Sequence, residues 1–278
     1  MKKFIEDIKK YYKYIIYATR SNLKTEVANS YLNWLWWILD PLCFMLVYTF
    51  IVEIVFKTKE VCFPVFVLIG LTVWNFFNMN VNSSVKLISN NKAIVDKVYI
   101  PKYILTLVKM FTNLFKMMIS WALILIMMLF FKVPYTLYLL QFLPVLIVLF
   151  TLSFGISSLL MHFGVFIEDL NNVMTIVLKL VFYMSGIFYA IPTRIPTPFN
   201  SILLNLNPIA LIIDSFRKMF IYQSIVDFKM LLLWFIVGLV LSFIGIKTVQ
   251  KYENSYAKVT KWKNMLLVLK TYISVIEH

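Results

Sequence analysis

Residues 138–162 read YLLQFLPVLIVLFTLSFGISSLLMH, an apolar run with no Asp, Glu, Lys or Arg. A helix needs roughly 20 apolar residues to cross a bilayer core about 30 Å thick, because it rises about 1.5 Å per residue. A membrane β-strand would be about 10 residues long and would alternate in polarity, which this run does not do. The run therefore predicts a transmembrane helix.

Five further stretches are similar, so we predict an all-α integral membrane protein with six transmembrane helices. The predicted spans are Trp34–Phe56, Cys62–Asn82, Ile104–Phe131, Tyr138–His162, Asn171–Ala190 and Phe228–Thr248. The composition agrees, because 61% of the 278 residues are hydrophobic and only 14% are charged. A soluble domain usually carries about 25% charged residues.

The basic residues predict the orientation. Of 27 Lys and Arg residues, 17 lie in residues 1–30, 85–102 and 247–278, which six spans would place on one side of the membrane. Cytoplasmic segments of membrane proteins are enriched in Lys and Arg. Both termini are therefore expected in the cytosol, with residues 251–278 as a basic tail. The net charge of +14 is then mainly a topology signal, and nucleic-acid binding is not expected.

The segment before the first span has an amphipathic pattern. Phe4, Ile8, Tyr11 and Ile15 recur every three or four residues, with lysines between them. This spacing predicts a helix that lies on the cytosolic face of the membrane. A basic leader that only orients the first span is the alternative.

The longest predicted cytosolic connection is Val85–Lys102. Its residues Ile94, Val95 and Val98 follow helical spacing, and Pro101 ends the segment. A short helix parallel to the membrane fits this pattern, and such a helix could dock into a groove of a cytosolic partner. A loop that merely covers helix ends is the alternative.

The second cytosolic connection, Phe163–Asn172, carries Glu168 and Asp169 but no Lys or Arg. These acids depart from the positive trend on that side, so they could have a specific basic partner. Asn171 and Asn172 could equally cap the next helix.

Residues 191–227 form the long connection on the outer side. Four of the nine prolines fall here: Pro192, Pro196, Pro198 and Pro208. Ser201–Leu206 and Ile209–Ile213 are nevertheless apolar. Irregular backbone can enter a membrane where protein or a water cavity shields it. We predict two short re-entrant helices, with an ordinary external loop as the alternative.

Several charged residues fall within predicted spans. Asp40 either faces protein or water, or stays hydrated at the interface. Lys109 can extend to the cytosolic interface. Lys116 and Lys179 lie nearer the middle of their spans, where they could line a pathway or pair with acids.

Several signatures of enzymes are missing from the sequence. No G-x-x-x-x-G-K-[ST] phosphate loop is present. Two histidines and two cysteines are too few, and too far apart, for a zinc site. No metal and no cofactor are expected in this chain. A transporter, a channel or a membrane scaffold remains.

Several motifs resemble, in order and over nearly the whole chain, the permease subunits of type-2 ABC exporters of polysaccharide, O-antigen or teichoic acid. Leu23–Leu42 is similar to the family's entry into its first span. Asn90–Pro101 resembles the pattern N-x-x-L-V-x-K-V-x-F-P, and Leu206–Arg217 resembles an L-N-P block followed by F-R. Glu26 stands where a basic residue is usual, and Phe166–Asp169 lacks the usual Arg.

The resemblance implies a homodimer in the bacterial plasma membrane that pairs with two copies of a separate ATPase, which would bind ATP and Mg. The substrate would be a lipid-linked polysaccharide. Residues 1–30 would be a cytosolic gate helix, and residues 31–250 the transmembrane domain. Within that domain, residues 90–101 would be the coupling helix and residues 191–227 the outer gate.

The resemblance also implies two groups of functional residues. Those that contact the ATPase would be Asn91, Ile94, Val95, Lys97, Val98, Tyr99, Pro101, Glu168 and Asp169. Those that line the conduit would be aromatic or basic: Trp36, Tyr48, Lys116, Lys179, Phe182, Tyr183 and Tyr189. Aromatic residues also gather at membrane interfaces, so a packing role stays open for each. Export of drugs or small lipids, or a channel or scaffold without an ATPase, are the alternative functions.

Overall fold

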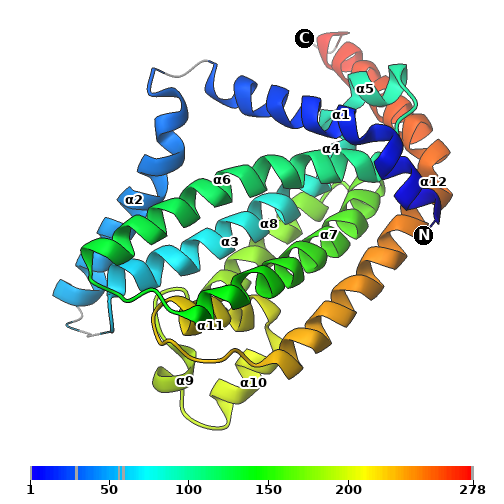
Figure 1. Ribbon diagram of the computed structural model, residues 1–278. Coiled ribbons are helices and arrows are strands. Elements are labelled where there is room, and N and C mark those ends of the chain that lie inside the picture. The colour runs from blue at the N-terminus through cyan, green and yellow to red at the C-terminus, as the bar shows by residue number, and fades with distance from the viewer. Residues whose placement is uncertain (1, 29–30, 56, 58–59, 277–278) are drawn as a thin grey trace.

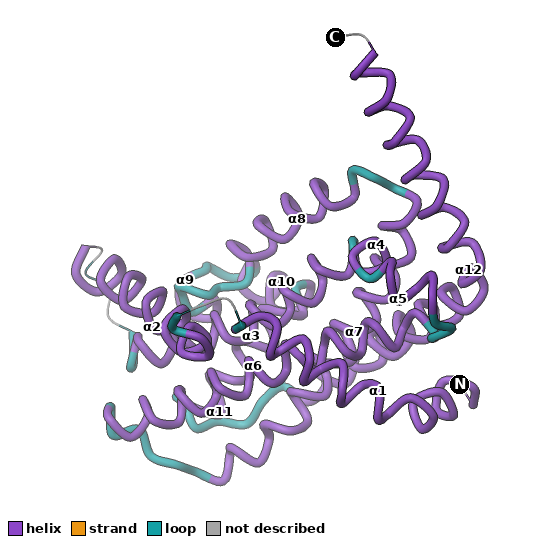
Figure 2. The backbone as a smooth tube through the Cα atoms, turned by 90° about the horizontal axis from the view of Figure 1, so that it is seen from above, coloured by secondary structure: helices purple, strands orange, loops and turns teal. Residues whose placement is uncertain are grey.

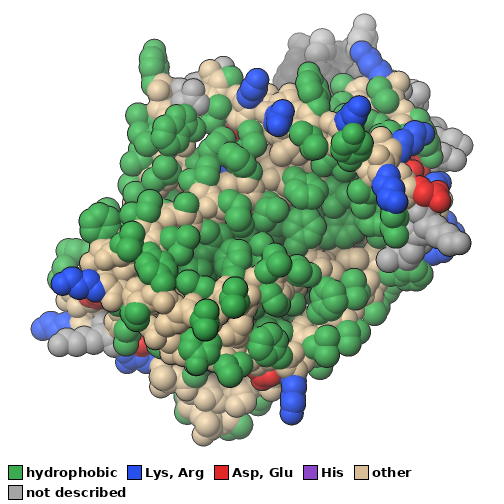
Figure 3. Space-filling model, viewed as in Figure 1, with side chains coloured by type: hydrophobic (Ala, Val, Ile, Leu, Met, Phe, Trp, Pro, Cys, Tyr) green, Lys and Arg blue, Asp and Glu red, His purple; other side chains and the backbone are tan. Residues whose placement is uncertain are grey.

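The regular structure is entirely helical in the part of the chain that the computed structural model describes, residues 2–28, 31–55, 57 and 60–276 (Figures 1 and 2). The predicted all-α class is confirmed. Apolar side chains cover most of the face seen in Figure 3, and Lys and Arg gather mainly toward its edges. Such a surface suits a protein surrounded by lipid.

Five helical stretches are long and apolar enough to cross a membrane. They are α2 (Trp36–Thr49) with the π-helical turn Phe50–Val55, α3 (Phe63–Val85), α6 (Lys102–Phe130), Leu137–Phe166, which includes α7 (Phe142–Phe166), and the Phe228–Glu253 part of α12 (Phe228–Ile276). These stretches confirm five of the six predicted spans. The sixth predicted helix continues well beyond its expected end at Thr248.

The fifth predicted span, Asn171–Ala190, is wrong as a continuous helix. Its helical part, α8 (Leu170–Met184), has 15 residues, which gives a length of only about 22 Å. Gly186 ends the regular structure with a φ of 64°, and a Cβ there would lie 2.6 Å from Ile191. The chain must turn at this point, because only glycine adopts this backbone conformation freely.

Three helices follow α8, where two short re-entrant helices were predicted. They are α9 (Ile191–Arg194), α10 (Phe199–Leu206) and α11 (Pro208–Phe220). A bend of 101° separates α10 from α11. Nearly all of α11 is buried, whereas α10 has no buried residue.

The central helix of the bundle is α3, which lies among the other spans in Figure 1 and is buried along most of its length. In contrast, only Pro41 and Met45 are buried in α2 at the edge. Helices α7 and α12 pack closely at small residues. A Cβ on Gly155 would lie 2.8 Å from Ser242, and one on Gly245 would lie 2.7 Å from Ser158.

The remaining helices gather toward the end opposite α9 and α10 (Figure 1). They are α1 (Lys2–Val27), α4 (Leu87–Asn90) and α5 (Lys92–Lys97). Helix α1 lies along α6. Residues 277–278 of the predicted tail lie outside the described residues.

Candidate functional site

Glu26, in the last turn of α1, makes ion pairs with two lysines of α6. Its carboxylate accepts a hydrogen bond from Lys116 Nζ at 2.8 Å and lies 3.5 Å from Lys109 Nζ. The two lysines are seven residues apart, two helical turns, so they lie on the same face of α6. Lys109 therefore pairs with an acid of α1, a contact that the sequence analysis did not foresee.

A polar cavity of about 640 Å³ opens beside these ion pairs, between α1, α3, α6 and the start of α8. Its polar side chains come from all of these helices and from the α3–α4 boundary: Glu26, Asn78, Asn82, Ser83, Lys86, Asn90, Lys109, Asn113, Lys116 and Asn171. An adjoining cavity of about 310 Å³ contains Trp36, Trp37 and Asp40. Glu26 and Lys116 border both cavities. Asp40 is exposed and borders this smaller cavity.

Another basic residue, Arg217 of α11, is buried. Its guanidinium donates to the carbonyl oxygens of Gly186 and Ile187 at 2.7 Å each, and to that of Phe66 at 3.3 Å. It also lies 3.4 Å from the centroid of the Phe66 ring. A Cβ on Gly70 would lie 3.0 Å from Arg217 Nη2, so glycine leaves the space that this side chain needs.

Asn207, the central residue of the L-N-P block, joins the start of α11 to the end of α8. Its side-chain oxygen accepts from the amides of Ile209 and Ala210, which caps α11. Its amide nitrogen donates to the carbonyl oxygen of Met184 and to Ser185 Oγ. Asn207 and Arg217 thus bind the two ends of α11 to the irregular segment that follows α8.

An aromatic row connects α2 with α8. The Tyr48 ring lies 4.0 Å from that of Phe188, which lies 5.4 Å from Phe182. Phe182 lies 5.3 Å from Tyr183, and Tyr189 donates a hydrogen bond to the Tyr183 carbonyl oxygen. The structure therefore brings together four of the proposed conduit residues. Phe188 completes the row, although the sequence pattern did not single it out.

The other three proposed conduit residues lie elsewhere. Trp36 and Lys116 border the cavities near Glu26. Lys179 is exposed on α8, beside a row of exposed apolar residues that includes Ile176, Leu180 and Tyr183. Trp36 thus belongs with the smaller cavity, Lys116 with both cavities, and Lys179 with an open apolar face.

The proposed coupling residues divide into exposed and anchoring groups. Ile94, Lys97, Val98 and Tyr99 are exposed on α5 and directly after it, and Glu168 and Asp169 are exposed between α7 and α8. Val95 and Pro101 are buried, and Asn91 is half-buried. The short α5 is therefore fixed by its buried side and presents apolar side chains on its open side. Asn171 and Asn172 lie inside α8, whose N-cap is Asp169 without a capping side-chain bond.

Hydrogen bonds connect Tyr99, just after α5, with the first and last helices, α1 and α12. Tyr99 donates to Glu253 of α12 at 3.3 Å, and Tyr11 of α1 donates to the Tyr99 carbonyl oxygen at 3.3 Å. The Glu253 carboxylate raises the pKa of Tyr99 above its ordinary value. Nearby, Tyr103 donates to Asp7. A displacement of α5 would therefore pull on α1 and α12 together.

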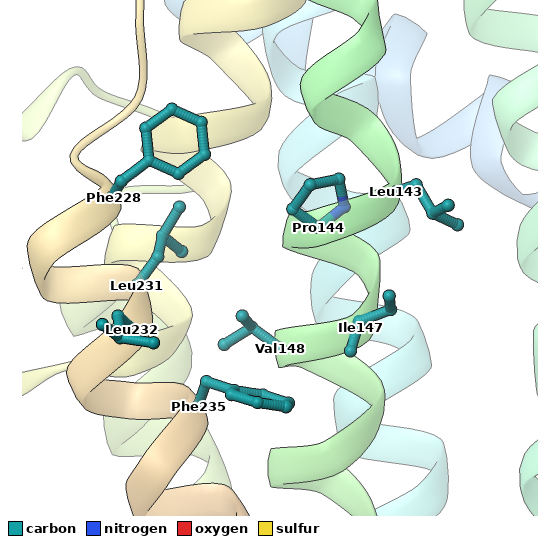
Figure 4. A pocket seen from close by; sticks show the side chains of 8 residues that line it. All are labelled: Leu143, Pro144, Ile147, Val148, Phe228, Leu231, Leu232 and Phe235. Atoms are coloured by element: carbon teal, nitrogen blue, oxygen red, sulfur yellow. The ribbon is translucent and has the colours of Figure 1, made fainter.

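The groove drawn in Figure 4 lies between the first turns of α7 and α12. Its lining is apolar and includes Ile147, Val148, Leu231 and Phe235. Such a surface offers packing and no polar chemistry. Among the described residues, no group of three His, Cys, Asp or Glu side chains could hold a metal ion.

Sequence reasoning missed the pairing role of Glu26. The sequence did contain a signal, because Glu26 is an acid at a position where the resembled family usually has a basic residue. The structure places it opposite two lysines of a later helix. The spacing of Lys109 and Lys116 placed them on the same side of one helix. Nothing in the sequence showed that the end of α1 would return to that side.

Comparisons with known proteins find transporters and export permeases. The family described as "ABC-2 type transporter" matches residues 14–221. The "O-antigen export system permease protein RfbA" of Myxococcus xanthus is 24% identical over 258 residues, which cover 93% of this chain and 99% of that protein. A protein of the same description from Klebsiella pneumoniae is 25% identical over 248 residues, which cover 88% of this chain and 94% of that protein.

Proposed function

The chain belongs to the ABC-2 type transporter family, and we propose that it is the transmembrane subunit of an ATP-driven exporter of a lipid-linked polysaccharide. The observation that carries the choice of substrate is the similarity to O-antigen export permeases along almost the full length of both chains. The long match includes the outer helices and the cytosolic connections, and not only apolar spans.

The exposed side of α5 supports a partner at the proposed cytosolic end. Ile94, Val98 and Tyr99 expose 37%, 51% and 65% of their surface beyond the apolar spans. An apolar helix face of this kind fits a groove in another protein. We propose that the groove belongs to an ATPase subunit, present in two copies, that binds ATP and Mg while this chain holds no cofactor.

The edge helices support a second copy of this chain. Helices α2 and α8 bury few of their apolar residues, only Pro41 and Met45 in α2 and Leu178 in α8, and the aromatic row from Tyr48 to Tyr183 lies between them. Aromatic rings offer apolar faces to sugar rings. We propose a homodimer whose conduit is lined by these rows, in the bacterial plasma membrane with both termini in the cytosol.

Purification together with an ATP-binding subunit tests this function. The chain should recover an ATPase from membranes of its host, and the reconstituted pair should hydrolyse ATP faster than the ATPase alone. A chain that purifies and functions without such a subunit would instead be a channel or a scaffold. A pair whose ATPase responds to drugs and not to lipid-linked glycans would be a drug exporter.

Val98→Asp tests the contact itself. An acid on the exposed side of α5 should reduce recovery of the ATPase about tenfold or more, because it places an unpaired charge in an apolar interface. Membrane insertion should not change, since Val98 is exposed. Ile225→Asp is the matched control, because Ile225 is also exposed but lies in the outer connection. Equal recovery from both variants would exclude α5 as the coupling helix.

A further inference from the structure

Glu26 lies where three cavities meet. It borders the polar cavity of about 640 Å³, the cavity of about 310 Å³ that contains Asp40, and a third of about 380 Å³ between α1, α4 and α6. The ion pairs with Lys109 and Lys116 are therefore not packed into a core. They stand at the boundary of open space within the protein.

The exposure of these groups permits exchange of the anion. The side chains of Lys116, Lys109 and Glu26 remain 16%, 30% and 33% exposed. Partly exposed ion pairs contribute little to stability, because water and other ions compete with each partner. A stronger or better placed anion can therefore replace the Glu26 carboxylate without a large loss of free energy.

The charges around the cavity favour an anionic ligand. Lys86 adds a third ammonium group to those of Lys109 and Lys116, and Glu26 is the acid within this cavity. Asp40 is the other acid nearby, and it borders the adjoining cavity. Once Glu26 withdraws, three lysines would face the open space, and lysine ammonium groups bind phosphate well as point charges.

The wall between the lysines is also polar. Asn113 donates to Asn80 Oδ1 at 2.8 Å, so its own Oδ1 is turned away from that bond. Asn78, Ser83 and Asn90 line the cavity as well, with amide and hydroxyl groups that can donate hydrogen bonds. An apolar ligand would cover these groups without any compensation. The cavity therefore suits a polar headgroup better than an acyl chain.

We propose that Lys109 and Lys116 bind a phosphate group of the lipid-linked substrate, and that Glu26 occupies their ammonium groups when substrate is absent. The proposal rests on the export function above and names the part of the substrate that this cavity recognises. Binding would exchange one anion for another on the same two lysines. No covalent bond forms or breaks.

The exchange would also release one end of α1. Residues 24–26 are exposed, and the Glu26 ion pairs join this end of the helix to α6. The other end of α1 has separate anchors, the buried Ile15 and the hydrogen bond from Tyr103 to Asp7. Phosphate binding would therefore free the C-terminal turn of α1 while its first half stays in place.

Lipid binding to the purified full-length chain tests the proposal. Native mass spectrometry would follow titration with dioleoyl phosphatidic acid, a phosphate monoester, and with dioleoyl phosphatidylcholine for comparison. Lys109→Gln and Lys116→Gln should each weaken phosphatidic acid binding about tenfold, through loss of a charged hydrogen-bond donor. Glu26→Gln should strengthen binding up to about fivefold, because it removes the competing carboxylate.

Two further variants keep the test decisive. Glu26→Gln/Lys116→Gln leaves no newly unpaired acid, and should bind more weakly than Glu26→Gln if Lys116 holds the phosphate. Lys132→Gln is the control, since this exposed lysine lies at the other end of α6. Unchanged binding in both lysine variants, or weaker binding in Glu26→Gln, would overturn the proposal.

Inorganic pyrophosphate separates the two sources of phosphate. Competition by pyrophosphate with the same dependence on Lys109 and Lys116 supports the phosphate site. The ratio of the two affinities then shows whether the site prefers a lipid or a soluble anion. Because this assay needs no ATPase, its failure is distinct from failure of the export function, which would appear as the absence of an ATPase partner.

Discussion

Arg217 and the pair of Lys109 and Lys116 are basic side chains within the same helical bundle, yet their surroundings differ in kind. Arg217 is 3% exposed and donates to three backbone carbonyl oxygens. The lysines share one carboxylate and border open cavities. The planar guanidinium has five donors in a fixed fork and can satisfy several fixed acceptors at once, whereas an ammonium group on a flexible stem adapts to a ligand that changes.

The difference teaches how to separate a structural charge from an exchangeable one. A charge that stabilises the fold is enclosed and has rigid backbone partners. A charge that is available to a ligand has a mobile side-chain partner and space beside it. Substitution of Arg217 should therefore mainly lower stability, whereas substitution of Lys109 or Lys116 should mainly lower affinity for a ligand.

Arg217→Met should have the largest effect. Loss of the guanidinium leaves the carbonyl oxygens of Gly186 and Ile187 buried without their donor, at a cost of about 1–3 kcal/mol for each. The unfolding temperature of the detergent-solubilised chain, followed by tryptophan fluorescence, should fall clearly. Arg194→Met is the control, because Arg194 makes a partly exposed ion pair with Glu60 that should contribute about 1 kcal/mol or less.

Arg217→Lys makes the same test more specific. Lysine keeps the charge but lacks the fork that reaches Gly186, Ile187 and Phe66 together. We expect an unfolding temperature between those of the wild type and Arg217→Met. A lysine variant as stable as the wild type would show that charge alone suffices, and would remove the basis of the comparison.

Asn207→Ala should have an intermediate effect. It removes the cap of α11 and the hydrogen bonds to Met184 and Ser185, and loss of a helix cap costs about 1 kcal/mol. The same unfolding measurement applies. Asn205→Ala is the control, since Asn205 is exposed on α10 and accepts from Trp234 through its backbone carbonyl, which the substitution keeps. Equal losses in the two variants would contradict the role of Asn207.

Lys116→Gln should have the smallest effect on stability, within about 1 kcal/mol, because its ion pair is partly exposed and Lys109 still faces Glu26. Its unfolding temperature should stay close to that of the wild type, while its affinity for lipid phosphate falls. A loss of stability as large as that of Arg217→Met would assign Lys116 to the fold and not to a ligand.

The comparison also shows where sequence reasoning succeeds. The apolar run at residues 138–162 is long enough that hardly any soluble arrangement could bury it, so its transmembrane character follows from hydrophobicity alone. The same argument located α2, α3, α6 and α12. Motif order identified the L-N-P block and the α5 segment, because turn and cap residues act locally through the backbone.

Sequence reasoning failed where a distant partner changes local structure. The run Asn171–Ala190 is apolar enough to predict one span. The chain nevertheless leaves the helix after Met184, where Gly186 turns and the carbonyl oxygens of Gly186 and Ile187 meet Arg217 from α11. No periodicity within the run indicates that donor, which lies about 30 residues later in the sequence.

The sequence by itself therefore determined the class of protein, five of its spans and the family resemblance, because hydrophobic length and local motifs need no distant contact. Only the tertiary structure decided which charges are enclosed and which border a cavity. That distinction depends on what lies opposite each side chain, a carbonyl of a packed backbone or a carboxylate beside a cavity. Such neighbours come together only when segments far apart in the chain have folded against one another.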